Sequence, residues 1–477
     1  MTVISHAAAA AEAFADLDVL WLQGHYAPVF DELDVADLEV TGQLPAGLRG
    51  TFLRNGPNPL FPPLGRYHVF DGDGMVHGLT FDGEGGASYA NRWVRNDGFE
   101  AEVAAGKALF GGLSDFRFPP DEIFASIGPV KNTSNTHVVR HAGRILTLME
   151  GQGPYELRSD LSTVGRYDFG GALEGSMTAH PKEDPVTGEL VFFGYSPIAP
   201  YLRVHTAAAD GTLTWSTIVE LPGPVMMHDF VITATRVVIF DLPAAFDVHA
   251  LVKGDPGIYW APERGARIGL LDRGAPGDTV QWIDVDPFWV FHFLNAHDAD
   301  DGSGAIEVVG CRTERLNTSF GDEELDQPYR PNLYRWRIDP VAGTLTSTQL
   351  DDRPTDFPRL NESRTGLAYR YGYTGSTAKW NEGEAIFDGV IKHDLQTGAS
   401  EVHRYGPNQV CGETVFAADP ASADEDGGWL LNFVHDLTTD RSSVVVLDAA
   451  TVVEVARVQL PRRVPFGFHG SFLPAEG

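Results

Sequence analysis

The chain has 477 residues, about two to three times the usual length of one domain, yet its composition nowhere shifts as it would at a linker. Hydrophobic residues make up 43% and charged residues 21%, a balance that excludes disorder over most of the length. The 66 acidic residues outnumber the 35 basic ones, and the formal net charge of -31 excludes nucleic acid as a partner. We therefore expect one domain over residues 1–477, with residues 1–20 as an N-terminal helical extension.

The first element in the chain favours a cytoplasmic location. Residues Met1–Leu20 are rich in alanine and contain acidic residues, but no basic segment precedes an apolar run, so we predict a helix at Ala8–Leu20 and no secretory signal. No stretch reaches the roughly 18 apolar residues of a membrane span. Cys311 and Cys411 are too few for a disulfide framework, which suits a reducing compartment, and we expect both to be small buried hydrophobic residues.

Glycine and proline interrupt the rest of the chain so often that short strands should dominate it. A further helix is expected only at Ala101–Leu109. Strands are predicted where β-branched residues lie between turn formers, as at Ile145–Met149, Leu190–Gly194, Phe230–Phe240, Ile306–Val309 and Ser443–Leu447. The expected fold class is all-β.

One turn pattern recurs between these runs: an acidic residue, a few small polar residues and usually a glycine. Copies begin at Asp82, Asp184, Asp210, Asp272, Asp339, Asp394 and Asp448. The last four begin 67, 55 and 54 residues apart, near the length of a four-stranded propeller blade with long loops. Because the repeat is degenerate, the pattern alone leaves a propeller, a sandwich and a barrel open.

Several familiar motifs are incomplete. A calcium loop starting at Asp298 would need a glutamate where Val309 stands. The segment Gly194–Ile198 lacks the second glycine of a nucleophile elbow, and Gly151–Glu156 lacks the third glycine of a dinucleotide loop. No phosphate-binding loop or HExxH motif occurs, so a serine hydrolase, a nucleotide-binding protein and a zinc protease are all poorly supported.

Four of the sixteen histidines interrupt apolar, strand-like runs, where a polar ring needs a partner. They are His180, His228, His292 and His469, separated by 48, 64 and 177 residues. Such spacing is no local motif, but the inner strands of propeller blades face one axis, where single histidines from separate blades can meet. One such residue alone is better explained as a hydrogen-bonded core histidine. Four histidines of the same kind favour a metal site for iron, zinc, copper or nickel.

Neutral imidazoles bring no negative charge to a divalent metal, so such a site would need carboxylates behind the rings. Each carboxylate would accept the second ring N–H, fix the tautomer and offset the charge of the cation. Glu150, Asp356 and Glu413 lie in apolar surroundings that suit this role, because buried acids without partners are costly.

Motifs along nearly the whole chain, from Tyr26 to Phe472, resemble those of the carotenoid cleavage oxygenase family. They are Phe52–Pro59, Tyr67–His77, Asn135–His137, Met149–Glu150, Ala179–Lys182, Met227–Phe230, Phe291–Ala296, Asp356–Asn361 and Gly467–Gly470. The resemblance implies a seven-bladed β-propeller, with a cap of loops and short helices over a metal site on the axis.

The resemblance also implies non-haem Fe(II) bound by His180, His228, His292 and His469. It places Glu150 behind His228, Asp356 behind His292 and Glu413 behind His469, and leaves His180 without an acidic partner. Thr136 falls where similar proteins have a small side chain that screens one open coordination position. Family members usually have glutamate at the position of Asp356. The shorter side chain implies a backbone that moves inward, a bridging water or a more loosely held ligand.

The activity that the resemblance implies is dioxygenase cleavage of a conjugated C=C bond, with O2 giving two carbonyl products. Its partners would be a lipophilic alkene and O2; no organic cofactor, catalytic acid or base, or obligate protein partner is implied. Three alternatives stay open: cleavage of a stilbene or phenylpropenoid, isomerohydrolase-like chemistry on a retinoid ester, and a propeller that binds apolar ligands without cleaving them.

The expected substrate is an apolar polyene or apocarotenoid. Family members that cleave stilbene-like phenols resemble one another in a lysine directly before the first carboxylate and an upstream tyrosine, and here these positions hold Met149 and Phe99. A polar anchor for the substrate is therefore missing. Candidate tunnel-lining residues, each also compatible with core packing, are Phe61, Phe99, Phe110, Phe116, Met149 and Phe293.

A lipophilic substrate has to leave a membrane or a carrier, so an apolar rim is expected near the tunnel mouth. Leu109–Leu113 and Phe246–Leu251 could form it, or could be buried beneath the cap. Because the net charge opposes strong binding to anionic lipid, only weak peripheral membrane contact is expected.

Overall fold

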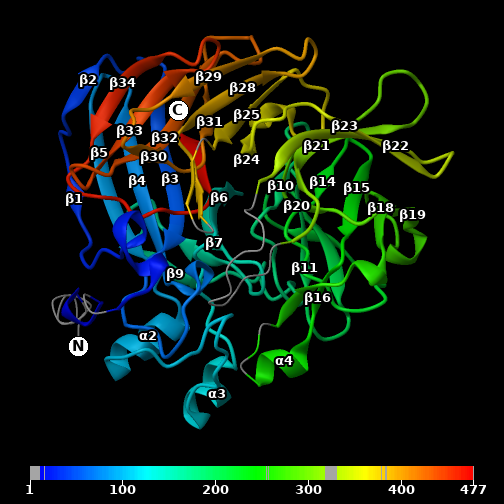
Figure 1. Ribbon diagram of the computed structural model, residues 1–477, viewed down its shortest axis with the longest axis horizontal. Helices are drawn as coiled ribbons and strands as arrows, with labels where there is room; N and C mark the ends of the chain where they lie inside the picture. Colours follow the sequence, from blue (N-terminus) through cyan, green and yellow to red (C-terminus); the bar gives the residue numbers. More distant parts are fainter. Residues whose placement is uncertain are drawn as a thin grey trace.

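The computed structural model describes residues 11–14, 17–253, 255, 257–316, 330–377, 379–381 and 384–475. Within these residues, seven sheets of four to six strands stand around a common axis and form a seven-bladed β-propeller (Figure 1). The ring arrangement confirms the fold implied by the family resemblance and excludes the sandwich and the barrel.

Both ends of the chain take part in closing the ring. The first sheet contains β1 (Asp34–Val35), β5 (Ala87–Trp93), β4 (Gly74–Asp82), β3 (Arg49–Pro57) and β35 (Gly470–Pro474), in that order. The last sheet contains β2 (Val40–Gly42), β34 (Glu454–Gln459), β33 (Arg441–Asp448), β32 (Gly428–Asp436) and β30 (Gln409–Cys411), with β31 (Val415–Ala418) also paired to β32. C-terminal β35 pairs antiparallel with β3, and N-terminal β2 pairs with β34. The blue and red ends of the chain are therefore joined in Figure 1.

The five remaining blades are antiparallel four-stranded sheets. They are β6 (His137–His141), β7 (Arg144–Leu148), β8 (Tyr155–Leu157), β9 (Thr163–Arg166); β10 (Lys182–Glu183), β11 (Leu190–Tyr195), β12 (Leu202–Ala207), β13 (Leu213–Ile218); β14 (Val231–Ile232), β15 (Arg236–Asp241), β18 (Ala266–Asp272), β19 (Gln281–Val285); β20 (Trp289–Asp298), β21 (Ile306–Thr313), β22 (Asn332–Asp339), β23 (Thr344–Gln349); and β24 (Thr355–Arg359), β25 (Tyr371–Ser376), β28 (Gly389–Asp394), β29 (Ser400–Arg404). The first strands of neighbouring blades contact one another, β14 with β20 and β20 with β24, so these strands surround the axis. Two short ribbons pair β16 (Ala244–Phe246) with β17 (Ile258–Trp260) and β26 (Lys379–Asn381) with β27 (Glu384–Ile386).

The α-helices lie outside the sheets, along the lower edge in Figure 1. They are α2 (Asp97–Ala105), α3 (Asp121–Ile127) and α4 (Val248–Val252). Single 3₁₀ turns occur at Leu20–Leu22, Gly24–Tyr26, Val69–Asp71, Pro262–Arg264, Gly277–Thr279 and Glu362–Arg364. No helix in the described ranges is both long and apolar enough to cross a lipid bilayer.

The helix predicted at Ala101–Leu109 exists but begins earlier. The Asn96 side chain accepts a hydrogen bond of 2.8 Å from the Phe99 N–H and caps the start of α2, while Gly106, with φ of +69°, ends it. Of the helix predicted at Ala8–Leu20, residues 11–14 are helical and residues 17–19 are not; the other positions up to residue 19 lie outside the described residues.

Four of the five predicted strands are confirmed as β7, β11, β21 and β33. The prediction of one strand over Phe230–Phe240 is wrong, because β14 and β15 form a hairpin there. The Thr233 hydroxyl accepts hydrogen bonds from the N–H groups of Thr235 and Arg236 and makes the turn. The acidic turns are confirmed in the same way: at Asp184, the carboxylate accepts the N–H of Val186 at 2.8 Å.

The hydrophobic core is divided among the interfaces between blades. One cluster joins Val238, Phe240 and Ile268 of the fourth blade to Val308 and Trp336 of the fifth, all nearly inaccessible to solvent. Sheet packing of this kind buries one face of each strand against the next blade and fixes the positions of the inner strands. Cys311 and Cys411 are both free and buried, as expected.

Candidate metal centre

The four histidines singled out in the sequence lie at the inner strands of four blades. His292 belongs to β20 and His469 stands directly before β35, whereas His180 and His228 lie in the segments that lead into β10 and β14. In β20 the pairing with β21 shifts register between Val290 and Phe293, so His292 sits on a bulge. A bulge re-aims a side chain, and here it turns the ring toward the axis.

The four rings meet at one point. One nitrogen from each ring lies within 4.8 Å of the others, and all four residues are at most 8% exposed. The Nε2 atom of His228 lies 3.0 Å from that of His180 and 3.1 Å from that of His292. Within a ring of four imidazoles, separations this short require either a shared proton or a cation between the nitrogens.

The carboxylates behind the rings favour a cation over a shared proton as the explanation. His292 Nδ1 lies 2.9 Å from Asp356 Oδ1, His469 Nδ1 lies 2.9 Å from Glu413 Oε1, and His228 Nδ1 contacts Glu150. A neutral ring that donates Nδ1–H to a carboxylate presents a lone pair at Nε2. Lone pairs of His228 and His292 then face each other at 3.1 Å. Two metal ligands at right angles with bonds of about 2.1 Å stand about 3.0 Å apart, so these residues fit a bound transition metal.

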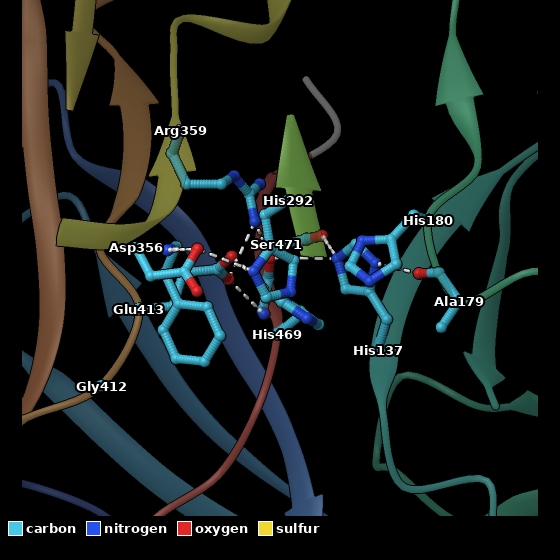
Figure 2. A network of polar contacts seen from close by, with 12 residues as sticks. His137, Ala179, His180, His292, Asp356, Arg359, Gly412, Glu413, His469 and Ser471 are labelled. Carbon is cyan, nitrogen blue, oxygen red and sulfur yellow. Dashed lines mark hydrogen bonds and ion pairs between the residues drawn. The ribbon is translucent and has the colours of Figure 1, made fainter. Parts of the chain in front are cut away.

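Two of the carboxylates are themselves held in place, and Figure 2 shows the contacts of Glu413. Glu413 Oε2 accepts hydrogen bonds of 2.9 Å from Arg359 Nη1 and from the Gly470 N–H. The Tyr195 hydroxyl donates to Glu150 Oε2 at 2.6 Å. Among the described residues, no carboxylate contacts the His180 ring. Three of the four rings therefore have the orienting partner that metal-bound histidines usually have.

Electrostatics keep most of the cluster ready to bind a cation. Burial lowers the pKa of His180 far below its ordinary value, and the neighbouring histidines add to this. Burial also lowers the pKa of His469, to about 4, against the opposing effect of Glu413. For His292, burial lowers the pKa, but Asp356, Asp229 and Glu413 together raise it above its ordinary value. Burial opposes ionisation of Glu413, yet Arg359 and His469 hold its pKa well below the usual range.

Asp356 reaches His292 directly despite its short side chain. The pairing of β24 with β25 shifts register between Asp356 and Arg359, and Phe357 adopts a φ of +52°. Beside this left-handed conformation, which is costly for a bulky residue, the Asp356 carboxylate lies 2.9 Å from the ring. Of the three arrangements that the sequence left open, this direct contact excludes the bridging water.

The cluster separates two cavities. A larger one, of about 850 Å³, reaches His228, His292 and His469 and has many aromatic and aliphatic side chains in its wall. A smaller one, of about 470 Å³, reaches His180, His292 and His469 from the other side and contains charged groups such as Arg359 and Glu413. Apolar side chains such as Phe293 and Leu294 also line the smaller cavity, but the larger one has the more extensive apolar wall.

Most of the expected tunnel residues lie at the larger cavity: Phe61, Phe110, Phe116 and Met149. The expectation was wrong for Phe99, which is fully buried in α2 and stacks on Trp93. Phe293 does not line the larger cavity: it follows His292 on β20, lines the smaller cavity and stacks on Phe240 with ring centroids 4.2 Å apart.

Thr136 lines the larger cavity beside the cluster and stands directly before β6. Its carbonyl accepts a hydrogen bond of 3.0 Å from the His469 N–H, and its hydroxyl donates to Asn135 at 3.0 Å. The backbone therefore ties the position of Thr136 to that of one histidine.

The two segments expected at an apolar rim are partly buried. Leu109 and Phe110 are buried, whereas Leu113 is exposed and lines the larger cavity. In the second segment, Phe246 and Leu251 line the cavity, and Val248 of α4 is exposed. Each segment therefore contains both cavity-lining and exposed residues.

Sequence reasoning missed His137, which lies between the cluster and the smaller cavity. Its Nδ1 is 2.8 Å from the Ala179 carbonyl, and its ring centroid is 5.5 Å from that of His469 (Figure 2). Its place directly after Thr136 was the available signal. Arg359 and Tyr195, which hold Glu413 and Glu150, were missed because only the fold brings them there.

Comparisons with known proteins agree with this geometry. The family described as retinal pigment epithelial membrane protein matches residues 26–474. The chain is 36% identical over 495 residues to a carotenoid 9,10(9',10')-cleavage dioxygenase 1 of Pisum sativum, covering 95% of this chain and 90% of that protein. It is 35% identical over 502 residues to a carotenoid cleavage oxygenase of Mycobacterium tuberculosis, covering 95% and 97%.

Solved structures show the same fold. The lignostilbene dioxygenase of Pseudomonas brassicacearum superposes with a TM-score of 0.89 at 29% identity, covering 96% of this chain and 99% of that one. Cobalt-substituted Synechocystis ACO superposes with a TM-score of 0.86 at 28% identity, covering 95% and 98%. The chain therefore belongs to the carotenoid cleavage oxygenase family and is an oxidoreductase of the oxygenase class.

Proposed function

We propose that this protein is a non-haem Fe(II) dioxygenase that cleaves one conjugated C=C bond of a carotenoid or apocarotenoid. The observation that carries the proposal is the convergence of four histidine nitrogens within 4.8 Å at the wall of a largely apolar cavity of about 850 Å³. Relatives named as carotenoid cleavage dioxygenases support the same reaction class.

His180, His228, His292 and His469 would hold the iron, and Glu150, Asp356 and Glu413 would orient three of these rings. An all-imidazole donor set suits a divalent transition metal, and the ionised carboxylates behind it offset the charge. When bound, ferrous iron supplies the electronic means for O2 to react with an alkene.

The chain's own residues exclude water and position the alkene. Phe61, Phe110, Phe116 and Met149 give the cavity wall an apolar surface, against which a conjugated chain can lie. Cleavage of R–CH=CH–R' by O2 gives R–CHO and R'–CHO, so each carbonyl product takes one oxygen atom and no reductant is consumed. Because no side chain needs to move a proton, positioning decides which bond is cut.

A second candidate is the cleavage of a stilbene or phenylpropenoid, favoured by the close superposition on lignostilbene dioxygenase. Two observations favour the polyene. Met149, where stilbene-cleaving relatives are expected to have lysine, lies at the cavity, and Phe99 is buried away from it. Neither side chain can bind a phenol oxygen.

Anaerobic purification, metal analysis and an assay under 18O2 test the proposal. We expect about one iron per chain, and 18O-labelled aldehydes from β-apocarotenals at higher kcat/KM than from stilbenes. Iron-free protein without aldehyde product would contradict the proposal. Retention of uncleaved ligand would instead indicate a binding propeller, and an alcohol formed from a retinoid ester would indicate isomerohydrolase-like chemistry.

We further propose that the protein acts in the cytoplasm and collects its substrate by weak peripheral contact with a membrane. Leu64 and Leu113 are exposed and line the cavity, so they offer an apolar rim. The net charge of -31 keeps binding to anionic lipid weak. Co-sedimentation with neutral vesicles, but not with anionic ones at low salt, is the expected result.

A further inference from the structure

A charged group lies in the wall of the larger cavity, apart from the histidine cluster. Lys131, between α3 and β6, forms ion pairs with Asp73, which precedes β4, and with Glu102 of α2. All three residues line the cavity, and their side chains are 10% exposed or less. We call these three residues the Lys131 triad.

Each member of the Lys131 triad is held rigidly. The second carboxylate oxygen of Asp73 accepts the Leu60 N–H at 3.0 Å, and the second oxygen of Glu102 accepts the Leu109 N–H at 2.8 Å. The stem of Lys131 lies against α2, because a Cβ built on Gly98 would come within 2.7 Å of Lys131 Cγ. Burial alone would lower the pKa of Lys131, but the two carboxylates raise it above its ordinary value. The ammonium group is thus fixed and charged.

The Lys131 triad has hydrogen-bonding capacity to spare. An ammonium group has three N–H donors, and two carboxylates engage this one. In the described part of the chain, no third acceptor contacts Lys131. The carboxylate oxygens keep unused lone pairs beside it. A ligand atom that both accepts and donates a hydrogen bond fits this group, and a hydroxyl group does both.

We propose that the Lys131 triad is a specificity-determining site that binds a hydroxyl group at one end of the alkene substrate. This inference rests on the proposed function, since it concerns the same cavity. Buried ion groups are costly unless fully paired, and a hydroxyl would complete the pairing of Lys131 that an apolar end leaves unmade. The two carboxylates also disfavour an anionic end group. The expected order of affinity is hydroxyl, then unsubstituted ring, then carboxylate.

Equilibrium binding to the metal-free protein tests the inference without requiring cleavage. The probes are three apocarotenals that differ only in the ring substituent, which is hydroxyl, hydrogen or carboxylate. Quenching of tryptophan fluorescence reports binding, because Trp21 lines the cavity. We expect wild-type protein to bind the hydroxylated probe about tenfold more tightly than the unsubstituted one, as for one added hydrogen-bonded group.

Lys131→Met should remove this preference, so that the two probes bind with equal Kd. Lys392→Met is the matched control, because Lys392 is also buried and paired, with Asp426, but lines neither cavity; it should keep the preference. Equal Kd values in wild-type protein, or a preference that persists in Lys131→Met, would overturn the inference.

The wild-type measurements decide the matter even if Lys131→Met does not fold, because the three probes must bind in the stated order. Failure of the proposed function has a different signature: neither the hydroxylated nor the unsubstituted probe is cleaved by the iron-loaded protein, whatever their Kd values. The two failures are therefore distinguishable.

Discussion

The histidine cluster and the Lys131 triad are both buried polar groups beside the larger cavity, but they are built differently. The cluster stands on the inner strands of four blades or in the segments that lead into them, and the packing between blades fixes these strands. The Lys131 triad joins a residue before β4, a residue of α2 and a residue of the segment between α3 and β6.

This difference suggests that the histidine cluster determines the chemistry and the cavity wall determines which substrate is bound. A metal site tolerates little displacement of its ligands, so rigid strands suit it, whereas a substrate contact can vary with the loops and helices outside the sheets. We therefore expect changes in the cluster to affect metal content and turnover for every substrate. Changes in the cavity wall should affect the choice of substrate.

The largest effect is expected for His292→Ala. Loss of one of four rings should remove most of the iron and reduce cleavage by far more than the roughly 10- to 100-fold typical of losing an outer partner. Metal analysis and the 18O2 assay measure both quantities. His205→Ala is the control, because His205 is buried in β12, bonded to Ser216 and outside the cluster; iron should be retained. Full iron content in His292→Ala would show that the histidine cluster does not hold the iron.

Asp356→Ala should have a smaller effect of the same kind. Because Asp356 accepts the Nδ1–H of His292, its loss should weaken iron binding roughly 10- to 100-fold. Titration of metal-free protein with Fe(II) gives the affinity. Asp356→Asn keeps a hydrogen-bond acceptor without the charge, so its loss of iron affinity should be smaller than that of Asp356→Ala. An unchanged affinity in Asp356→Ala would show that the contact does not orient the ring.

Met149→Lys should change selectivity and leave the metal site intact. Met149 lies at the cavity directly before Glu150, and a lysine there could bind a phenol oxygen. We expect kcat/KM for a hydroxystilbene to rise about tenfold relative to a β-apocarotenal, as for one added hydrogen bond to a charged group. Met149→Leu keeps the apolar shape and should leave the ratio unchanged. A large loss of iron from Met149→Lys would contradict this prediction, because it would show that the cavity wall affects metal binding by the cluster.

The smallest effect is expected for Gly98→Ala. Alanine favours a helix over glycine by about 1 kcal/mol, but here its Cβ would press on Lys131 Cγ at 2.7 Å. If Lys131 is rigid, the two effects should nearly cancel in Tm, and the preference for the hydroxylated probe should fall two- to threefold, about 0.5 kcal/mol. A rise in Tm with an unchanged preference would show that Lys131 moves freely.

The sequence by itself determined the parts of the protein that depend on local pattern. Short strands between acidic turns, four histidines in apolar runs and three acids in similar settings could all be identified, because β-branched residues and Asp-containing turns act over a few residues. The hairpin at Thr233 and the early start of α2 were missed, since a single side-chain cap or turn decides them.

Only the tertiary structure decided which polar groups meet. Sequence suggested that the cavity lacks a polar anchor, because Met149 and Phe99 occupy the positions that were compared. Folding instead brings Asp73, Glu102 and Lys131 together from separate segments. It also turns Phe293 toward the smaller cavity and brings Asp356 into direct contact with His292. Contacts of this kind depend on ring closure and on how the cap packs, and neither leaves a periodic signal in the sequence.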